Sequence, residues 1–233
     1  GFMSERTIAA LSTPAGEGGI AVIRISGEDA VSIADKVFCA FNKKALSTLS
    51  GYTAAYGEIV SGGESLDDCV ALVFKAPKSY TGEDMVEFHC HGGMAITQGL
   101  LKKTFELGAK PASKGEFTKR AFLNGKMSLT QAESVMNLIS AQNDRALNIA
   151  TRNGSGALSE KIKEMTDKIL FLVSQISVYS DFPEDETLLI SEDDFKLSLN
   201  QIKLGLETLI ADYDKGRLIM EGINTVIVGS PNA

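Results

Sequence analysis

The stretch GGIAVIRISG, residues 18–27, decides the fold of the first part of the chain. Its segment 20–26 is rich in β-branched residues and predicts a strand that begins after a glycine-rich loop. Residues 28–38 follow with apolar side chains at helical spacing, so a helix is expected directly after the strand. A strand that passes through a glycine into a short helix is typical of an α+β domain.

The same alternation of strand and helix extends in both directions from this stretch. Apolar runs of strand length are separated by turn residues such as Ser61-Gly62-Gly63, and a helical pattern ends on Gly108. We therefore expect an α+β domain over residues 1–120. Its further expected elements are strands at 7–11, 52–60, 69–74 and 86–91 and a helix at 94–107.

The pattern changes near residue 121. Residues 130–133, TQAE, match a capping box, which predicts one long helix from there to Gly154. Residues 158–179 continue at helical spacing, and Ser191 is placed to cap a further helix. Three successive helices predict the first part of an all-α helical-bundle domain over residues 121–222.

The last segment, INTVIVGSPNA at 223–233, predicts a buried strand followed by the opening of a phosphate-binding loop. The loop pattern G-x-x-x-x-G-K-[ST] would continue beyond Ala233 with a glycine, a lysine and a hydroxyl. We expect this segment to be the first strand and partial phosphate loop of a truncated α/β GTPase domain.

The composition limits the classes of function. With 44% apolar residues among 233, the chain can form a substantial core, while a net charge of −7 argues against bulk electrostatic binding of nucleic acid or anionic membranes. Three scattered cysteines and no apolar stretch of membrane-spanning length predict a cytoplasmic protein that does not bind membranes. Any RNA contact is expected to be local.

Arg24 is the first candidate binding residue. Strand alternation places it on one face of its strand with Ile20 and Val22, so a guanidinium emerges from an apolar run. Such a charge needs a partner. Pairing with a structural carboxylate and binding of a ligand are equally compatible with the sequence.

The segment VEFHCH, residues 86–91, places Glu87, His89 and His91 on one strand face. A metal site is conceivable, but no further ligand is evident and such a face can equally line a polar pocket. A carboxylate at Glu87 could accept hydrogen bonds from an amino-heterocycle such as a pterin or purine, whereas the alternative is a surface glutamate.

The basic stretch KGEFTKRAFLNGK, residues 114–126, places four cations around Phe117, Phe122 and Leu123. These cations could hold an anionic ligand, or they could be the solvated face of an amphipathic helix. Composition does not decide between the two.

Four stretches together resemble one family, the MnmE (TrmE) tRNA-modification GTPases. The resemblance covers residues 7–233 in order, and in this family a GTPase domain that begins with a Gly-x-Pro-Asn-Ala-Gly-Lys-Ser loop is inserted into the helical domain. The matching motifs are TIAA at 7–10 with PAGEGGIAVIRISG at 14–27, SYTGED at 79–84 running to HGG at 91–93, GEFTKRAFLNGK at 115–126 with QAE at 131–133, and DFP at 181–183.

The resemblance implies that the first domain is an aminomethyltransferase-like module that binds 5-formyl-tetrahydrofolate or a related reduced folate and forms a homodimer. By motif position, the folate residues are Arg24, Glu87 and Lys126. A carboxylate at Glu87 suits the N–H edge of the pterin, and Arg24 or Lys126 suits the carboxylates of the glutamate tail. More weakly, the resemblance implies that His91 shapes the pocket and that Thr81 and Gly82 close it, and it gives no role to His89 or Cys90.

For the intact protein, the resemblance implies GTP hydrolysis with Mg²⁺ and K⁺. It also implies a heterotetramer with the flavoprotein MnmG (GidA) that adds a carboxymethylaminomethyl-type group to carbon 5 of the wobble uridine in tRNA. Asn232 and Ala233 would contact the nucleotide, and Asn232 would also bind K⁺. Because the phosphate-binding lysine lies beyond Ala233, this fragment is expected to be inactive in GTP hydrolysis.

Two further hypotheses stay open. The chain could be a dimerisation scaffold without folate chemistry, which would hold two GTPase domains in register. It could also be an aminomethyltransferase of the glycine-cleavage type, although residues 229–233 argue against this hypothesis.

Overall fold

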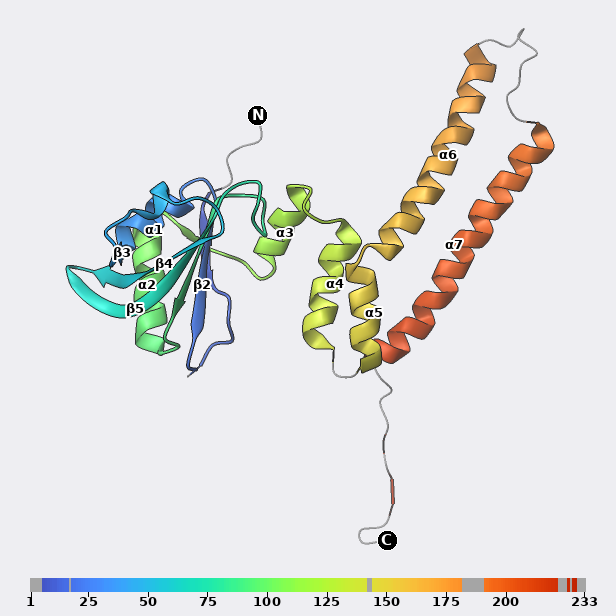
Figure 1. Ribbon diagram of the computed structural model, residues 1–233. Coiled ribbons are helices and arrows are strands. Elements are labelled where there is room, and N and C mark those ends of the chain that lie inside the picture. Colours follow the sequence, from blue (N-terminus) through green and yellow to red (C-terminus); the bar gives the residue numbers. More distant parts are fainter. Residues whose placement is uncertain are drawn as a thin grey trace. The chain divides into compact units, whose positions relative to one another are not determined.

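A seven-stranded sheet organises the first part of the chain in the computed structural model, which describes residues 6–16, 18–141, 144–181, 191–221, 226 and 228–229 (Figure 1). The chain divides into two compact units, residues 1–127 and 128–233. The sheet has the order β3-β4-β5-β6-β2-β1-β7, and every neighbouring pair is antiparallel except β1 and β7. The strands are β1 Ile8–Leu11, β2 Ala21–Ser26, β3 Phe38–Ala40, β4 Thr53–Ser61, β5 Glu64–Phe74, β6 Met85–Cys90 and β7 Lys110–Pro111.

Helices α1 (Ala30–Val37) and α2 (Met94–Glu106) pack on one face of this sheet and form the core of the first unit with it. Ile23 of β2 and Phe88 of β6 are fully buried there. Each buried side chain of this size contributes about 1.5–3 kcal/mol to folding. The short helix η1 (Leu46–Thr48) and helix α3 (Glu116–Leu123) complete the unit.

The antiparallel register of β2 and β6 places polar residues on the other face of the sheet. Arg24 is paired with Glu87, and Val22 with His89. Because side chains alternate along a strand, the neighbours Ile23, Ile25 and Phe88 point to the core while Arg24, Glu87 and His89 do not. This confirms the alternation expected from the sequence.

A buried polar network centred on Arg120 attaches α3 and residues 79–84 to β2. The Arg120 side chain is only 3% exposed, and its Nη1 lies 3.1 Å from both carboxylate oxygens of Glu83. Arg120 Nη2 also donates to the Arg6 carbonyl at 2.8 Å, and Ser26 Oγ donates to Glu83 at 2.7 Å. The network therefore joins segments that lie far apart in the sequence.

The second unit is helical. Helices α4 (Leu129–Ser140) and α5 (Asp144–Gly154) pack against each other, and the Gln131 side chain on α4 donates to the Gly154 carbonyl at 3.0 Å. Helices α6 (Ala157–Asp181) and α7 (Glu192–Glu221) are long, and Ser191 accepts a hydrogen bond from the Asp194 amide at the start of α7, as expected. Across the described residues, every helix is too short or too polar to span a bilayer.

Two details of the helical prediction were wrong. The single long helix expected up to Gly154 is the α4–α5 pair, because α4 ends where Ala141 is extended. The capping box begins at Ser128 rather than at Thr130: Ser128 Oγ accepts from the Gln131 amide, and the Gln131 side chain accepts from the Ser128 amide. Residues 128–131 and 130–133 both fit the capping-box pattern, and the structure forms the box at residues 128–131.

The mixed α/β first unit and the helical second unit confirm the fold class in outline. The aminomethyltransferase-like character of the first unit stays a prediction. Within the expected GTPase strand and loop, only Val226, Val228 and Gly229 are described, and all three are exposed. Asn232 and Ala233 lie outside the described residues.

Replacing Arg120 by methionine is expected to lower the free energy of unfolding of the first unit by about 3 kcal/mol, because the Glu83 carboxylate loses its buried partner. Hydrogen exchange of peptides from β2 and β6 across a urea series measures this unit separately from the helices. The control is Lys103→Met, since Lys103 forms a partly exposed pair with Glu106 at 3.3 Å and should change stability by less than about 0.5 kcal/mol. Equal stability of the two variants would contradict the anchoring role of Arg120.

Candidate functional site

Arg24 and Glu87 form a direct ion pair on the sheet face opposite the core. Arg24 Nη2 lies 2.7 Å from Glu87 Oε1, and Arg24 Nε donates to the same oxygen at 2.8 Å. The Glu87 side chain is 12% exposed, whereas the Arg24 side chain is 23% exposed. The structure therefore brings together two of the three residues expected to bind folate, and it supplies the carboxylate partner that an arginine in an apolar run requires.

Two aromatic rings hold the Arg24 guanidinium. Its central carbon lies 5.2 Å from the ring centre of Tyr80 and 5.2 Å from that of Phe117, within the range of cation–π attraction. The Tyr80 and Thr118 hydroxyls are hydrogen-bonded at 2.9 Å, which ties the Tyr80 segment to α3. Sequence reasoning missed Tyr80 and counted Phe117 only as part of an amphipathic stretch, because only the tertiary fold brings both rings to Arg24.

Lys126, the third expected residue, reaches the segment that carries Tyr80. Its Nζ donates to the Pro77 carbonyl at 2.9 Å, and its side chain lies over Gly82. Gly82 has φ +82°, and a Cβ built there would lie 3.3 Å from Lys126 Cγ, so glycine is needed both for the backbone and for this close approach. Thr81 beside it is fully buried, bonded to Ser26 at 2.7 Å. The folate roles of these residues stay predictions.

His91 points to a different neighbour. Its Nδ1 lies 2.7 Å from Asp67 Oδ1, and its backbone amide donates to Asp67 Oδ2 at 2.8 Å. His89 instead lies beside Glu87, with its Nε2 3.5 Å from Glu87 Oε2. Among the described residues, no three His, Cys, Asp or Glu side chains are grouped to hold a metal ion, which argues against the metal interpretation of this strand face.

The cysteines are free, and two of them belong to the core. Cys69 and Cys90 are buried, and Cys39 is exposed. Burial raises the pKa of Cys69 to about 12 and that of Cys90 to about 11. Since the thiolate is the reactive form, neither buried thiol is suited to nucleophilic chemistry near neutral pH.

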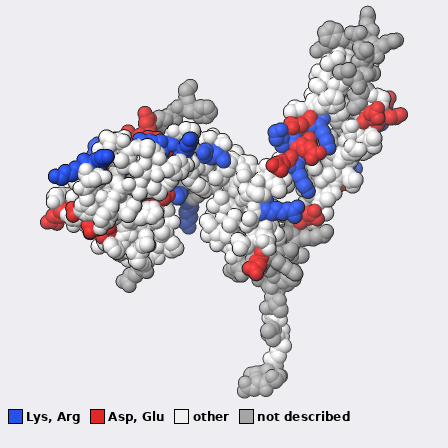
Figure 2. All heavy atoms as spheres, in the orientation of Figure 1, with Lys and Arg blue, Asp and Glu red and all other residues white. Residues whose placement is uncertain are grey.

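The four cations of the basic stretch 114–126 lie in two different environments. Arg120 is a buried structural cation, while Lys114, Lys119 and Lys126 are exposed. Figure 2 shows Lys and Arg side chains gathered along one edge of the first unit. The exposed lysines fit a solvated face, Arg120 fits neither alternative because it is buried, and the binding of an anionic ligand stays a prediction.

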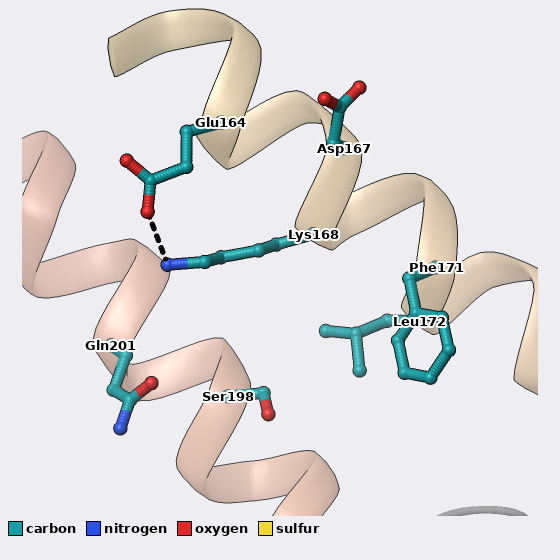
Figure 3. A pocket seen from close by; sticks show the side chains of 7 residues that line it. All are labelled: Glu164, Asp167, Lys168, Phe171, Leu172, Ser198 and Gln201. Carbon is teal, nitrogen blue, oxygen red and sulfur yellow. Dashed lines mark hydrogen bonds and ion pairs between the residues drawn. The ribbon is translucent and has the colours of Figure 1, made fainter.

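A separate hollow of about 370 Å³ lies between α6 and α7 (Figure 3). Lys168 crosses it to form an ion pair with Glu164 at 2.9 Å, and its hydrogen bond and charge lower the pKa of Glu164. Phe171 and Leu172 supply an apolar wall, and Ser198 and Gln201 of α7 line the other side. The charges of this hollow are satisfied along one helix face, so the Arg24–Glu87 pair is the stronger candidate site.

Comparisons with known proteins place both units in one family. Residues 7–126 match the family described as "GTP-binding protein TrmE N-terminus", and residues 129–227 match the "MnmE helical domain". These two matches leave out only short stretches of the chain.

Similar proteins are named tRNA modification GTPase MnmE. That of Carboxydothermus hydrogenoformans is 42% identical over 232 residues, covering 99% of this chain and 50% of that protein. Those of Streptococcus thermophilus and Bacillus subtilis are 42% and 40% identical, each covering 97% of this chain and 49% and 50% of the relative. The chain thus spans about half the length of the curated relatives it matches, and it belongs to the MnmE (TrmE) family.

Proposed function

We propose that the chain is part of a GTP-hydrolysing enzyme of tRNA modification, and that its first unit binds a reduced folate of the 5-formyl-tetrahydrofolate type. The relatives' name, tRNA modification GTPase, supports the first part. The proposed product carries a carboxymethylaminomethyl-type group on carbon 5 of the wobble uridine, made together with the flavoprotein MnmG in the cytoplasm. GTP, Mg²⁺ and K⁺ would be bound by the GTPase domain, with Asn232 as the K⁺ and nucleotide contact.

The ion pair of Arg24 with Glu87 is the observation that carries the folate proposal. A largely buried carboxylate held on the sheet face by a guanidinium, with two aromatic rings beside that guanidinium, offers an acceptor for a polar ring edge and apolar surface for ring faces. These groups fit an aminopyrimidinone ring. Lys126 brings a cation to the same segment, where it suits the carboxylates of a glutamate tail.

We propose in addition that the first unit forms a homodimer through exposed apolar side chains of the sheet. Phe41, Tyr56 and Val70 are 50%, 57% and 39% exposed, and the rings of Phe41 and Tyr56 lie 4.9 Å apart. Tyr56 of β4 is paired with Val70 of β5, so these side chains form one cluster. Covering such a cluster with a second copy removes apolar surface from water.

Calorimetric titration with 5-formyl-tetrahydrofolate tests the folate site. Replacing Glu87 by alanine is expected to weaken binding by roughly ten- to a hundredfold, because a charge-assisted hydrogen bond is lost. Arg24→Ala and Lys126→Ala should each weaken binding as well, and Lys103→Ala on α2 is the control. Unchanged binding in the first three variants would remove the proposed site, and an absence of heat with wild type would favour a scaffold without folate chemistry.

Gly82→Ala tests the approach of Lys126. A methyl group at this position would lie 3.1 Å from Asn124 Cβ and 3.3 Å from Lys126 Cγ, and the positive φ adds backbone strain of about 1 kcal/mol. We expect folate affinity to fall about as much as in Lys126→Ala, with little added effect in the double variant. Additive losses in the double variant would contradict this coupling.

Light scattering after size-exclusion chromatography tests the dimer. Wild type is expected at twice the monomer mass, and Tyr56→Lys should shift the protein towards the monomer because it places a charge in a cluster that the second copy would bury. The control is Met94→Lys, since Met94 is equally apolar and 64% exposed but lies on α2. A monomeric wild type, or a Tyr56→Lys protein that dimerises normally, would contradict the proposed interface.

A further inference from the structure

Exposed lysines gather along the edge of the first unit that includes α3 (Figure 2). Lys114 precedes this helix, Lys119 lies on it and Lys126 follows it. Lys78 lies next to them in a neighbouring turn, because Lys126 Nζ donates to the carbonyl of the adjacent Pro77 at 2.9 Å. All four lysines are exposed, and together they form a group that we call the lysine edge.

Hydrogen bonds within the first unit hold the segments of the lysine edge together. The Tyr80 hydroxyl is bonded to Thr118 Oγ1 at 2.9 Å, which ties the segment before α3 to the helix itself. The buried Arg120 side chain adds a second tie through Glu83, at 3.1 Å. The backbone positions of the four lysines are therefore fixed relative to one another.

The carboxylates of these segments are already engaged with other cations. Glu83 and Glu116 bind Arg120 at 3.1 and 3.2 Å. Asp84 pairs with Lys75 at 3.4 Å. Among the residues that the structure describes, no carboxylate forms an ion pair with any lysine of the edge. The charge of the lysine edge is thus not neutralised within the first unit.

Exposed lysines of the second unit are arranged differently. Lys163, Lys196 and Lys203 each pair with a carboxylate four residues away on the same helix, at 3.0, 2.5 and 3.8 Å. A solvated helix face typically mixes charges of both signs in this way. The lysine edge lacks such pairs, so it keeps its positive charge although the chain as a whole carries a net charge of −7.

We infer that the lysine edge binds the phosphate backbone of the RNA substrate. The inference rests on the proposed function in tRNA modification, which calls for contact with RNA but assigns no surface to it. Exposed lysines along a helix of about 12 Å suit several phosphates of one strand, whereas a single small anion is bound by donors that converge on one point.

An exposed aromatic ring accompanies these cations. Phe122 lies three residues after Lys119 on α3, so both side chains share a helix face, and Phe122 is exposed. Proteins that bind single-stranded RNA combine cations for the phosphates with aromatic rings on which unpaired bases stack. The lysine edge therefore carries both kinds of group that a local RNA contact requires.

The test measures binding of the full chain to an unmodified tRNA transcript by fluorescence anisotropy over a series of salt concentrations. Lys126 stays unchanged, because the folate proposal already uses it. The triple variant Lys78→Gln/Lys114→Gln/Lys119→Gln is expected to bind roughly tenfold more weakly or worse at low salt. Its slope of log affinity against log salt should be smaller by about 2–3, since each phosphate contact contributes roughly 0.7–0.9.

The matched control is Lys163→Gln/Lys196→Gln/Lys203→Gln, which removes the same charge from exposed lysines of the second unit. This control should bind RNA nearly as well as wild type. Equal losses in the two triple variants would indicate bulk electrostatic attraction and overturn the inference. Unchanged binding in the variant of the lysine edge would overturn it as well.

Calorimetry of the same proteins with 5-formyl-tetrahydrofolate that bears an oligoglutamate tail separates this inference from the folate proposal. A loss confined to the folate ligand would assign the lysine edge to the folate tail and contradict an RNA surface. If wild type binds folate but no RNA, the inference fails and the folate site stands. If wild type binds RNA through the lysine edge but no folate, the folate site fails and the inference stands.

Discussion

The antiparallel pairing of β2 with β6 is the constraint on which the first unit depends. It sets Arg24 opposite Glu87 and Val22 opposite His89, while Ile23, Ile25 and Phe88 enter the core on the other face. A shift of the register by one residue would turn the guanidinium and the carboxylate into that core, where an unpaired charge costs several kcal/mol. Core packing and the geometry of the candidate site are thus fixed by the same strand pair.

A second constraint brings remote segments to this strand pair. Arg120 of α3 binds Glu83, and Glu83 accepts from Ser26 at the end of β2, so residues 79–84 and α3 are held together beside the sheet. Tyr80 and Phe117 reach Arg24 from these two segments. A cation that is 3% exposed and bonded through both terminal nitrogens to carboxylates and a carbonyl is a rigid anchor, because movement would break buried charge pairs.

The sequence predicted the features that depend on side-chain alternation in strands and on helical spacing. Alternation every second residue along β2 and β6 placed Arg24 and Glu87 on the face away from the core. Helical spacing predicted positions for α2, α6 and α7 that are close to the observed ones. The sequence did not predict the partners of Arg24 and Glu87, since pairing between distant segments depends on tertiary structure. Arg120 looked like a surface cation for the same reason. Strand β5 begins at Glu64, earlier than expected, and the sequence contains little sign of this because Leu66 is the one apolar residue among residues 64–68.

The ion pair of Arg24 and Glu87 can be structural and functional at once, because the two roles use different atoms. Arg24 occupies Glu87 Oε1, and its own position is fixed between Tyr80 and Phe117. A ligand at Oε2 would then meet a carboxylate whose side chain is already ordered, so binding need neither break the pair nor immobilise a free side chain. An exposed glutamate would offer the same chemistry only at the added cost of ordering its rotamers. The structural pairing that the sequence left as the alternative for Arg24 is, on this view, what prepares Glu87 for a ligand.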